Sequence, residues 1–155
     1  MSTTRLTLSQ ALVKFLCAQK TIVDGQTVPL FAGVWAIFGH GNVPALGEAL
    51  HQHREELPTY RGHNEQAMVH AASGFAKQSR RHRMMVCTSS VGPGASNMVT
   101  GVATAFVNRL PVLVLPGDTF AHRASAPVLQ EVESLSDGTV TVSYTHLTLP
   151  TICSV

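Results

Sequence analysis

The sequence contains few charged residues. Asp, Glu, Lys and Arg make up 13% of its 155 residues, about half of the ~25% that is usual in globular proteins. The 11 basic and 9 acidic residues leave a formal net charge of +2. A disordered chain combines low hydrophobicity with high net charge, and a nucleic-acid-binding domain carries a basic stripe. With 45% hydrophobic residues and so little charge, the chain fits neither class.

Cysteines and long apolar runs are scarce as well. Cys17, Cys87 and Cys153 are far apart and form no C-x-x-C pair, so we expect neither a disulfide framework nor a zinc site. No apolar run approaches the ~18 residues that span a bilayer, and the N-terminus is a poor signal peptide. These absences predict a cytoplasmic protein that does not bind membranes.

Helical and strand patterns alternate along the chain. Thr7 to Gln10 has the T-x-x-Q form of a capping box and predicts a helix. A loop containing Asp24-Gly25 and Pro29 is expected next. Further helices are predicted at about 44–53, at 64–78, from Gly92 onward and near 128–134. Apolar runs predict strands at 31–38, 84–88 and 111–115, with short strands near Tyr60 and at 140–144.

This order predicts an α/β fold with a parallel sheet flanked by helices, because alternating strands and helices form βαβ units. Ligands bind beyond the carboxyl ends of the strands in such sheets. Those ends are predicted at Gly39–Asn42, Thr88–Gly94 and Gly117–Asp118.

Glu65 is the most informative single residue. It begins the predicted helix and shares a face with Val69, Ala72 and Ala76, which are all apolar. A carboxylate on an apolar stripe is costly unless it has a partner. Two interpretations stay open at this point: a functional acid, or a first-turn Glu that complements the helix dipole.

Two glycine motifs suggest a second kind of site. Gly39-x-Gly41 and Gly92-x-Gly94 each follow a strand and precede a helix, but both lack the third glycine of the dinucleotide-binding fingerprint. Asp118 follows Gly92 at about the distance of a ribose-binding acid. A nucleotide-binding module therefore remains an alternative, as do simple tight turns and a non-enzymatic regulatory domain.

The histidines do not predict a metal site. His51 and His53 are two positions apart on a helix, which points their rings well apart, and His63 and His70 lack a matching third ligand. The basic run Arg80 to Arg83 is interpreted as a solvated turn, too short to indicate nucleic-acid binding.

Four strings occur in the order that is typical of one enzyme family. The chain resembles the N-terminal, pyrimidine-binding domain of thiamine-diphosphate enzymes of the acetolactate-synthase type. Within that family it is most similar to the branch that opens a cyclic 1,2-diketone in inositol catabolism. The strings are Ile37–Val43, Asn64–Met68, Thr88–Asn97 and Pro127–Gln130.

The resemblance implies a role for particular residues. Glu65 occupies the position of the family's catalytic glutamate, which bonds N1′ of the aminopyrimidine ring and promotes proton loss from the thiazolium C2. Gly39, Gly92 and Asn97 would also contact the cofactor. His40, Asn42 and Gln130 would lie next to the substrate, a small cyclic diketone.

Two departures from the family pattern favour the inositol branch over acetolactate synthase and oxo-acid decarboxylases, which remain alternatives. Asn64 replaces a histidine that many relatives have before the glutamate. Ser90-Val91 lengthens the segment before Gly92 by about one residue.

The resemblance also implies parts that this sequence lacks. The family binds Mg²⁺ and the diphosphate in a C-terminal domain, and a second subunit of a homodimer or homotetramer completes each site. We therefore expect residues 1–141 to be an incomplete, truncated domain that is inactive alone. Residues 142–155 resemble a translated sequencing adapter and are expected to be non-native.

Overall fold

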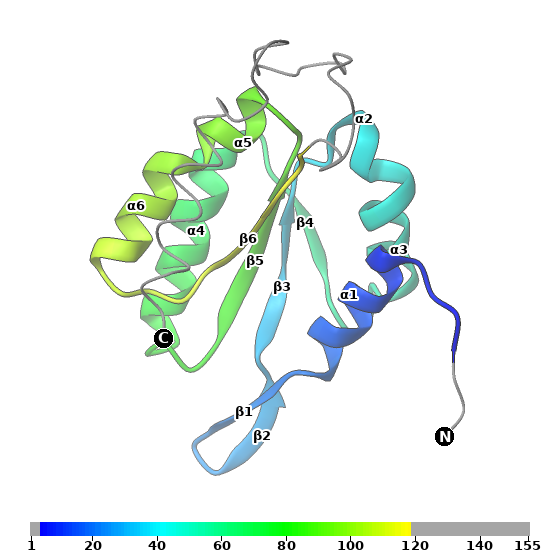
Figure 1. Ribbon diagram of the computed structural model, residues 1–155. Helices are drawn as coiled ribbons and strands as arrows, with labels where there is room; N and C mark the ends of the chain where they lie inside the picture. Colours follow the sequence, from blue (N-terminus) through cyan, green and yellow to red (C-terminus); the bar gives the residue numbers. More distant parts are fainter. Residues whose placement is uncertain (1–3, 119–155) are drawn as a thin grey trace.

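The structure is a computed structural model that describes residues 4–118. Four parallel strands form its central sheet in the order β4-β3-β5-β6 (Figure 1). They are β3 (Phe31–Ala36), β4 (Thr59–Arg61), β5 (Met84–Ser89) and β6 (Leu113–Pro116). The predicted α/β fold with a parallel sheet is confirmed. The elements expected near 128–134 and 140–144, Gln130 and the expected non-native tail lie outside the described residues.

Helices cover both faces of the sheet (Figure 1). One face packs against α1 (Leu8–Ala18), the π-helical turn η1 (Val43–Gly47) and α3 (Glu48–Gln52). The other face packs against α4 (Glu65–Gln78), α5 (Pro93–Asn97) and α6 (Val99–Val107). The strands serve both faces because successive side chains point in opposite directions.

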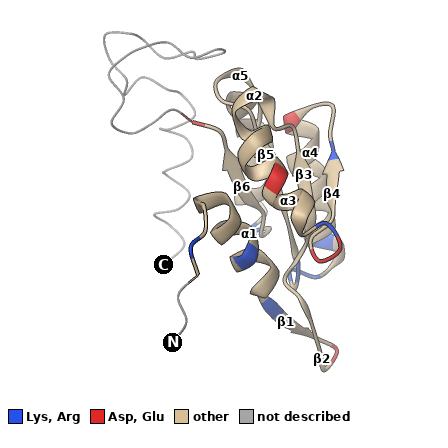
Figure 2. Cartoon of the chain, turned by 90° about the vertical axis from the view of Figure 1, so that its right-hand side faces the viewer, with Lys and Arg blue, Asp and Glu red and all other residues tan. Residues whose placement is uncertain are grey.

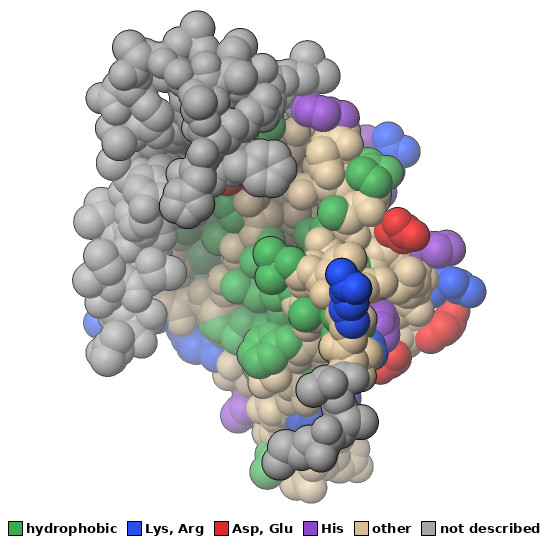
Figure 3. Space-filling model, turned by 45° about the vertical axis from the view of Figure 1, so that its right-hand side comes forward, with side chains coloured by type: hydrophobic (Ala, Val, Ile, Leu, Met, Phe, Trp, Pro, Cys, Tyr) green, Lys and Arg blue, Asp and Glu red, His purple; other side chains and the backbone are tan. Residues whose placement is uncertain are grey.

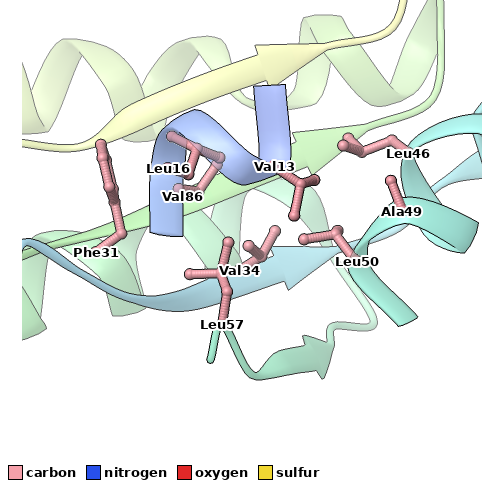
Figure 4. Close-up of a cluster of buried hydrophobic side chains, with 9 residues drawn as sticks. All are labelled: Val13, Leu16, Phe31, Val34, Leu46, Ala49, Leu50, Leu57 and Val86. Atoms are coloured by element: carbon pink, nitrogen blue, oxygen red, sulfur yellow. The ribbon is translucent and has the colours of Figure 1, made fainter. Parts of the chain in front are cut away.

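The two hydrophobic clusters show this alternation. Val34 and Val86 join the cluster beneath α1 and α3, which Figure 4 shows, whereas Cys87 joins the cluster beneath α4. Leu16 and Leu50 are almost completely buried in the first cluster. Each fully buried aliphatic side chain of this size stabilises the fold by roughly 1.5–3 kcal/mol relative to exposure.

The first helix begins as its sequence predicts. The Thr7 hydroxyl accepts a hydrogen bond from the Gln10 N–H at 3.2 Å, and Gln10 Oε1 accepts one from the Thr7 N–H at 3.0 Å. This reciprocal capping box satisfies two backbone donors at the helix N-terminus. Val13 and Leu16 then anchor the buried side of the helix.

The loop expected around Asp24 is instead a β-hairpin. Strands β1 (Lys20–Val23) and β2 (Gln26–Pro29) pair antiparallel across Asp24 and Gly25. Both turn residues have positive φ, +49° and +79°, as a type I′ hairpin turn requires. The expectation of a loop was wrong because an Asp-Gly pair favours a hairpin turn and a proline is tolerated at the end of an edge strand, where Pro29 lies.

The segment after β3 also differs from the expectation. Gly39–Asn42 forms a helical turn, α2, that continues into η1 and α3, whereas the sequence predicts a loop followed by a helix from about Pro44. The buried side chains of Leu46 and Leu50 hold the later turns on the sheet. Tertiary packing of this kind outweighs the low helix propensity of glycine.

Small residues allow α4 and α6 to approach closely. A Cβ on Gly101 of α6 would lie 2.7 Å from the Cβ of Val69 on α4. Ala72 and Ala76 of α4 are fully buried. No helix within residues 4–118 is long and apolar enough to cross a membrane.

Candidate active site

The cleft that contains a carboxylate, and is therefore the candidate active site, lies at the carboxyl end of the sheet. The chain runs from β3 to β4 on one side and then returns to β5 on the other side. The carboxyl ends of β3 and β5 therefore form a topological switch point, where α/β sheets bind ligands. An open cleft of about 670 Å³ occupies this place. It is lined by Ile37, Gly39, Glu65, Ser90, Pro93, Gly94, Ser96 and Asn97.

Glu65 reaches this cleft from the first turn of α4. The Asn64 side chain caps the helix by accepting a hydrogen bond from the Ala67 N–H at 2.9 Å. Met68 and Val69 in the next positions are buried, and they fix the helix on the sheet. The carboxylate is partly buried at the mouth of the cleft. The helix dipole favours a negative charge here, so the structure is compatible with the dipole interpretation and adds a specific partner.

That partner is Asn97, at the end of α5. Asn97 Nδ2 donates a hydrogen bond of 2.8 Å to Glu65 Oε2. A Cβ on Gly94 would lie 3.0 Å from Glu65 Oε1, so the backbone of α5 passes close to the second oxygen. One oxygen is thus held by an amide, while Oε1 has no hydrogen bond among the described residues. The sequence analysis named both residues, and the structure brings them together.

The two predicted glycines adopt backbone conformations that other residues rarely adopt. Gly39 has a φ of +64°, and a Cβ there would overlap the Ser90 side chain. Gly92 has a φ of +70° and precedes the first residue of α5. Both conformations favour glycine because it lacks a Cβ. They bring the loops after β3 and β5 together at the cleft.

A second cleft of about 660 Å³ adjoins the first along Ile37 and Gly39. His40 lines it together with Arg61, the last residue of β4, and His63, just beyond that strand. None of these three side chains has a hydrogen bond or ion pair within residues 4–118. Figure 3 shows histidine and basic side chains near one another at the upper edge of the molecule. The sequence did not indicate Arg61 for this cleft, and His63 was considered only as a metal ligand, because the short strand β4 gives little signal.

The remaining predicted residues lie apart from the clefts. Asn42 donates a long hydrogen bond of 3.4 Å to the Ser89 carbonyl and lines neither cleft. Asp118, the candidate ribose-binding acid, is exposed and lines neither cleft. The substrate-adjacent role of Asn42 stays a prediction.

The fold and this cleft agree with a family assignment. Residues 31–137 match the family described as thiamine pyrophosphate enzyme, N-terminal TPP binding domain, thiamine pyrophosphate being another name for thiamine diphosphate. The chain belongs to this family, which confirms the resemblance given by its four strings.

The chain is also similar to particular enzymes. It is 54% identical over 137 residues to the 3D-(3,5/4)-trihydroxycyclohexane-1,2-dione hydrolases of Bacillus thuringiensis (strain Al Hakam) and Bacillus cereus (strain 03BB102). It is 53% identical over the same length to the hydrolase of that name from Bacillus anthracis. These matches cover 88% of this chain and 21% of each relative. The chain therefore spans about a fifth of the length of the curated relatives it matches.

Proposed function

We propose that this chain supplies the pyrimidine-binding half of the active site of a thiamine-diphosphate-dependent hydrolase. The substrate is a cyclic 1,2-diketone of the trihydroxycyclohexane-1,2-dione type, and the ring is opened in inositol catabolism. The observation that carries the proposal is the Glu65 carboxylate, held by Asn97 in a cleft at the switch point of the sheet. The similarity to hydrolases of this name supports the choice of substrate.

The residues of the cleft fit an aminopyrimidine ring. Ile37 and Pro93 supply apolar surface for a flat ring, and Glu65 Oε1 supplies an acceptor for a ring nitrogen that carries a proton. Thiamine diphosphate, when bound, would supply the nucleophilic carbon that the opening of a diketone ring requires.

Glu65 would share this proton with the ring nitrogen through Oε1. Its hydrogen bond to Asn97 occupies Oε2 and fixes the orientation of the carboxyl group. A fixed acid of this kind contributes typically 10²–10⁴-fold to a reaction rate. Gly39 and Gly92 would let the backbone approach the cofactor closely.

The second cleft would receive the substrate. His40, Arg61 and His63 offer hydrogen-bond donors to carbonyl and hydroxyl oxygens. The cleft adjoins the Glu65 cleft, so a substrate there would lie next to the cofactor. Arg61 would also attract the carboxylate that ring opening produces.

Other parts of the enzyme would complete the site. We propose that Mg²⁺ and the diphosphate are held by another domain and that a second subunit of a homo-oligomer faces Glu65. Glu65 is the sole carboxylate that lines either described cleft, and one carboxylate is few ligands for Mg²⁺ together with a diphosphate. An acetolactate synthase or oxo-acid decarboxylase has less support than the hydrolase, because the relatives named above, at 53–54% identity, are hydrolases. A nucleotide-binding module has less support because Asp118 lines neither cleft.

A chimera tests the proposal. This chain would replace the homologous segment of the Bacillus thuringiensis hydrolase, and ring opening would be measured with thiamine diphosphate and Mg²⁺. We expect activity in the chimera and a loss of about 10²–10⁴-fold in its Glu65→Gln variant. The control is Glu48→Gln, an exposed acid on α3 that lines neither cleft, and it should leave the rate unchanged.

Two results would contradict the proposal. One is a chimera that binds the cofactor and is active but is indifferent to Glu65→Gln. The other is cofactor-dependent ring opening by the 155-residue chain alone, because the proposed site requires a second domain and subunit.

A further inference from the structure

A cluster of metal-binding side chains lies far from the clefts. Cys17 in the last turn of α1 meets His53 and Glu56, which follow α3, and one ligand atom from each lies within 4.8 Å of the others. Since α3 ends at Gln52 and precedes β4, the cluster lies toward the amino end of the sheet. It is the one group of three or more such side chains in residues 4–118.

The backbone on both sides of the cluster is held firmly. Leu16, next to Cys17, and Leu57, next to Glu56, are almost completely buried in the same hydrophobic cluster. The Leu57 N–H donates to the His53 carbonyl at 2.9 Å, which closes the turn that carries both ligands. The core therefore holds the backbone that carries the three side chains.

Two of the three side chains already interact. His53 Nδ1 lies 3.0 Å from Glu56 Oε1. In a tetrahedral zinc site, with Zn–S of about 2.3 Å and Zn–N or Zn–O of about 2.0 Å, neighbouring ligand atoms are roughly 3.5 Å apart. Glu56 is exposed and free to rotate, so a small rotation can bring the three ligand atoms to this spacing.

The electrostatic surroundings favour a cation. Both α1 and the helical segment that ends in α3 point their C-termini toward the cluster, and helix C-termini carry partial negative charge. Glu56 adds a full negative charge. Burial, and then the negative charge of Glu56, raise the pKa of the Cys17 thiol, and Lys20 is the nearby charge that opposes them.

We propose that Cys17, His53 and Glu56 bind a divalent transition-metal ion of the zinc class, with water in the fourth position. A thiolate, an imidazole and a carboxylate match the ligands of Zn²⁺, whereas Mg²⁺ and Ca²⁺ prefer oxygen alone. On binding, the Cys17 thiol releases its proton to solvent as the sulfur–metal bond forms, with no change of oxidation state. The metal would tie the end of α1 to the turn before β4. The spacing of the histidines does not indicate this site, because the other two ligands are a cysteine and a glutamate.

The test uses Co²⁺ as a spectroscopic substitute for Zn²⁺, with the tag-free full chain in a Cys153→Ser background. We expect a thiolate-to-cobalt charge-transfer band in the near ultraviolet and visible bands typical of four-coordinate cobalt, and Zn²⁺ should displace both. Cys17→Ser should abolish the charge-transfer band. His53→Ala and Glu56→Gln should weaken Zn²⁺ binding by about tenfold or more, as measured by calorimetry.

His51→Ala is the matched control, because His51 lies on the same helix and is outside the cluster. It should bind both ions as the unmodified chain does. Glu56→Gln alters an exposed residue, so it separates loss of binding from loss of folding, which circular dichroism checks for every variant. A band that persists in Cys17→Ser overturns the proposal. So does the absence of the band in the unmodified chain, or Zn²⁺ affinity unchanged in Glu56→Gln.

Discussion

The two helical layers of this domain are built differently. The α1/α3 layer (α1, η1 and α3) packs large aliphatic side chains against the sheet, including Leu16, Leu50 and Leu57. The α4/α6 layer (α4, α5 and α6) uses methionines, alanines and the close contact at Gly101. Bulk fills the space under the first layer, whereas close backbone approach replaces bulk under the second.

One long stretch of the α4/α6 layer has no charged residue. No Asp, Glu, Lys or Arg occurs from Met84 to Asn108, which includes β5, α5 and α6. Figure 2 shows charged residues on α1, on α3 and in the turn before β4, and none on α5. The candidate active site draws Asn97 from this uncharged stretch and Glu65 from the start of α4. We expect truncations in the α1/α3 layer to cost more stability, whereas the α4/α6 layer sets the geometry of the site.

The largest expected effect tests the first half of this comparison. Leu50→Ala removes a side chain that is 1% exposed in the α1/α3 layer and should lower the free energy of unfolding by about 2–5 kcal/mol. Met98→Ala is the matched truncation at a fully buried position of the α4/α6 layer, and it should cost about 2 kcal/mol, at the low end of the same range. Urea unfolding measures both. Equal losses would remove the distinction between the layers.

The contact between α4 and α6 gives the next prediction. Gly101→Ala places a methyl group 2.7 Å from Val69 Cβ, and it should destabilise the fold by about 1–3 kcal/mol. Gly74→Ala, at an exposed position of α4, is the matched control, because a Cβ there meets no atom within 4 Å. It should stabilise the fold by about 0.5–1 kcal/mol. Thermal unfolding of the two variants should therefore shift in opposite directions.

Cys87 allows a test by pH. Burial raises the pKa of its thiol from 9.0 to about 12, so the folded state keeps the thiol neutral while the unfolded state ionises above pH 9. The stabilising contribution is complete below pH 9 and is lost as the pH rises toward 12. At pH 10 the loss should be about 1.4 kcal/mol. Urea unfolding at pH 8 and pH 10 should show this loss in the native chain and not in Cys87→Ala; the same loss in both would exclude Cys87 as its source.

The smallest effect concerns the start of the α1/α3 layer. Thr7→Ala removes the hydroxyl that caps α1 and should lower the free energy of unfolding by about 1 kcal/mol. Thr7→Ser keeps an oxygen acceptor and should retain most of it. If Thr7→Ala has no effect in thermal unfolding, the capping box contributes nothing to this layer.

Periodicity predicted those parts of the fold in which one pattern dominates. The buried strands β3 and β5 and the capped helix α4 all lie where the sequence places them. The hairpin at Asp24 and the helical turn at Gly39 were missed because each depends on a competition between glycine chemistry and packing. The pattern of a short segment does not show which of these effects is larger.

The sequence indicated individual residues of the candidate site but not the contacts between them. Glu65 was expected from its place on an apolar stripe, and Asn97 from the family resemblance. Their hydrogen bond depends on the direction in which the five-residue helix α5 leaves Gly92. Arg61 and His63 were missed because β4 is three residues long, so its carboxyl end gave little signal.

The uncharged stretch has a practical consequence. Trypsin cleaves after Lys and Arg, and neither occurs between Arg83 and Arg109. Residues 84–109, which include β5, α5 and α6, are therefore released as one peptide, while Glu65 lies in another peptide that begins after Arg61. Chemical labelling of this one peptide, measured by mass spectrometry, would report whether anything covers the exposed residues of α6.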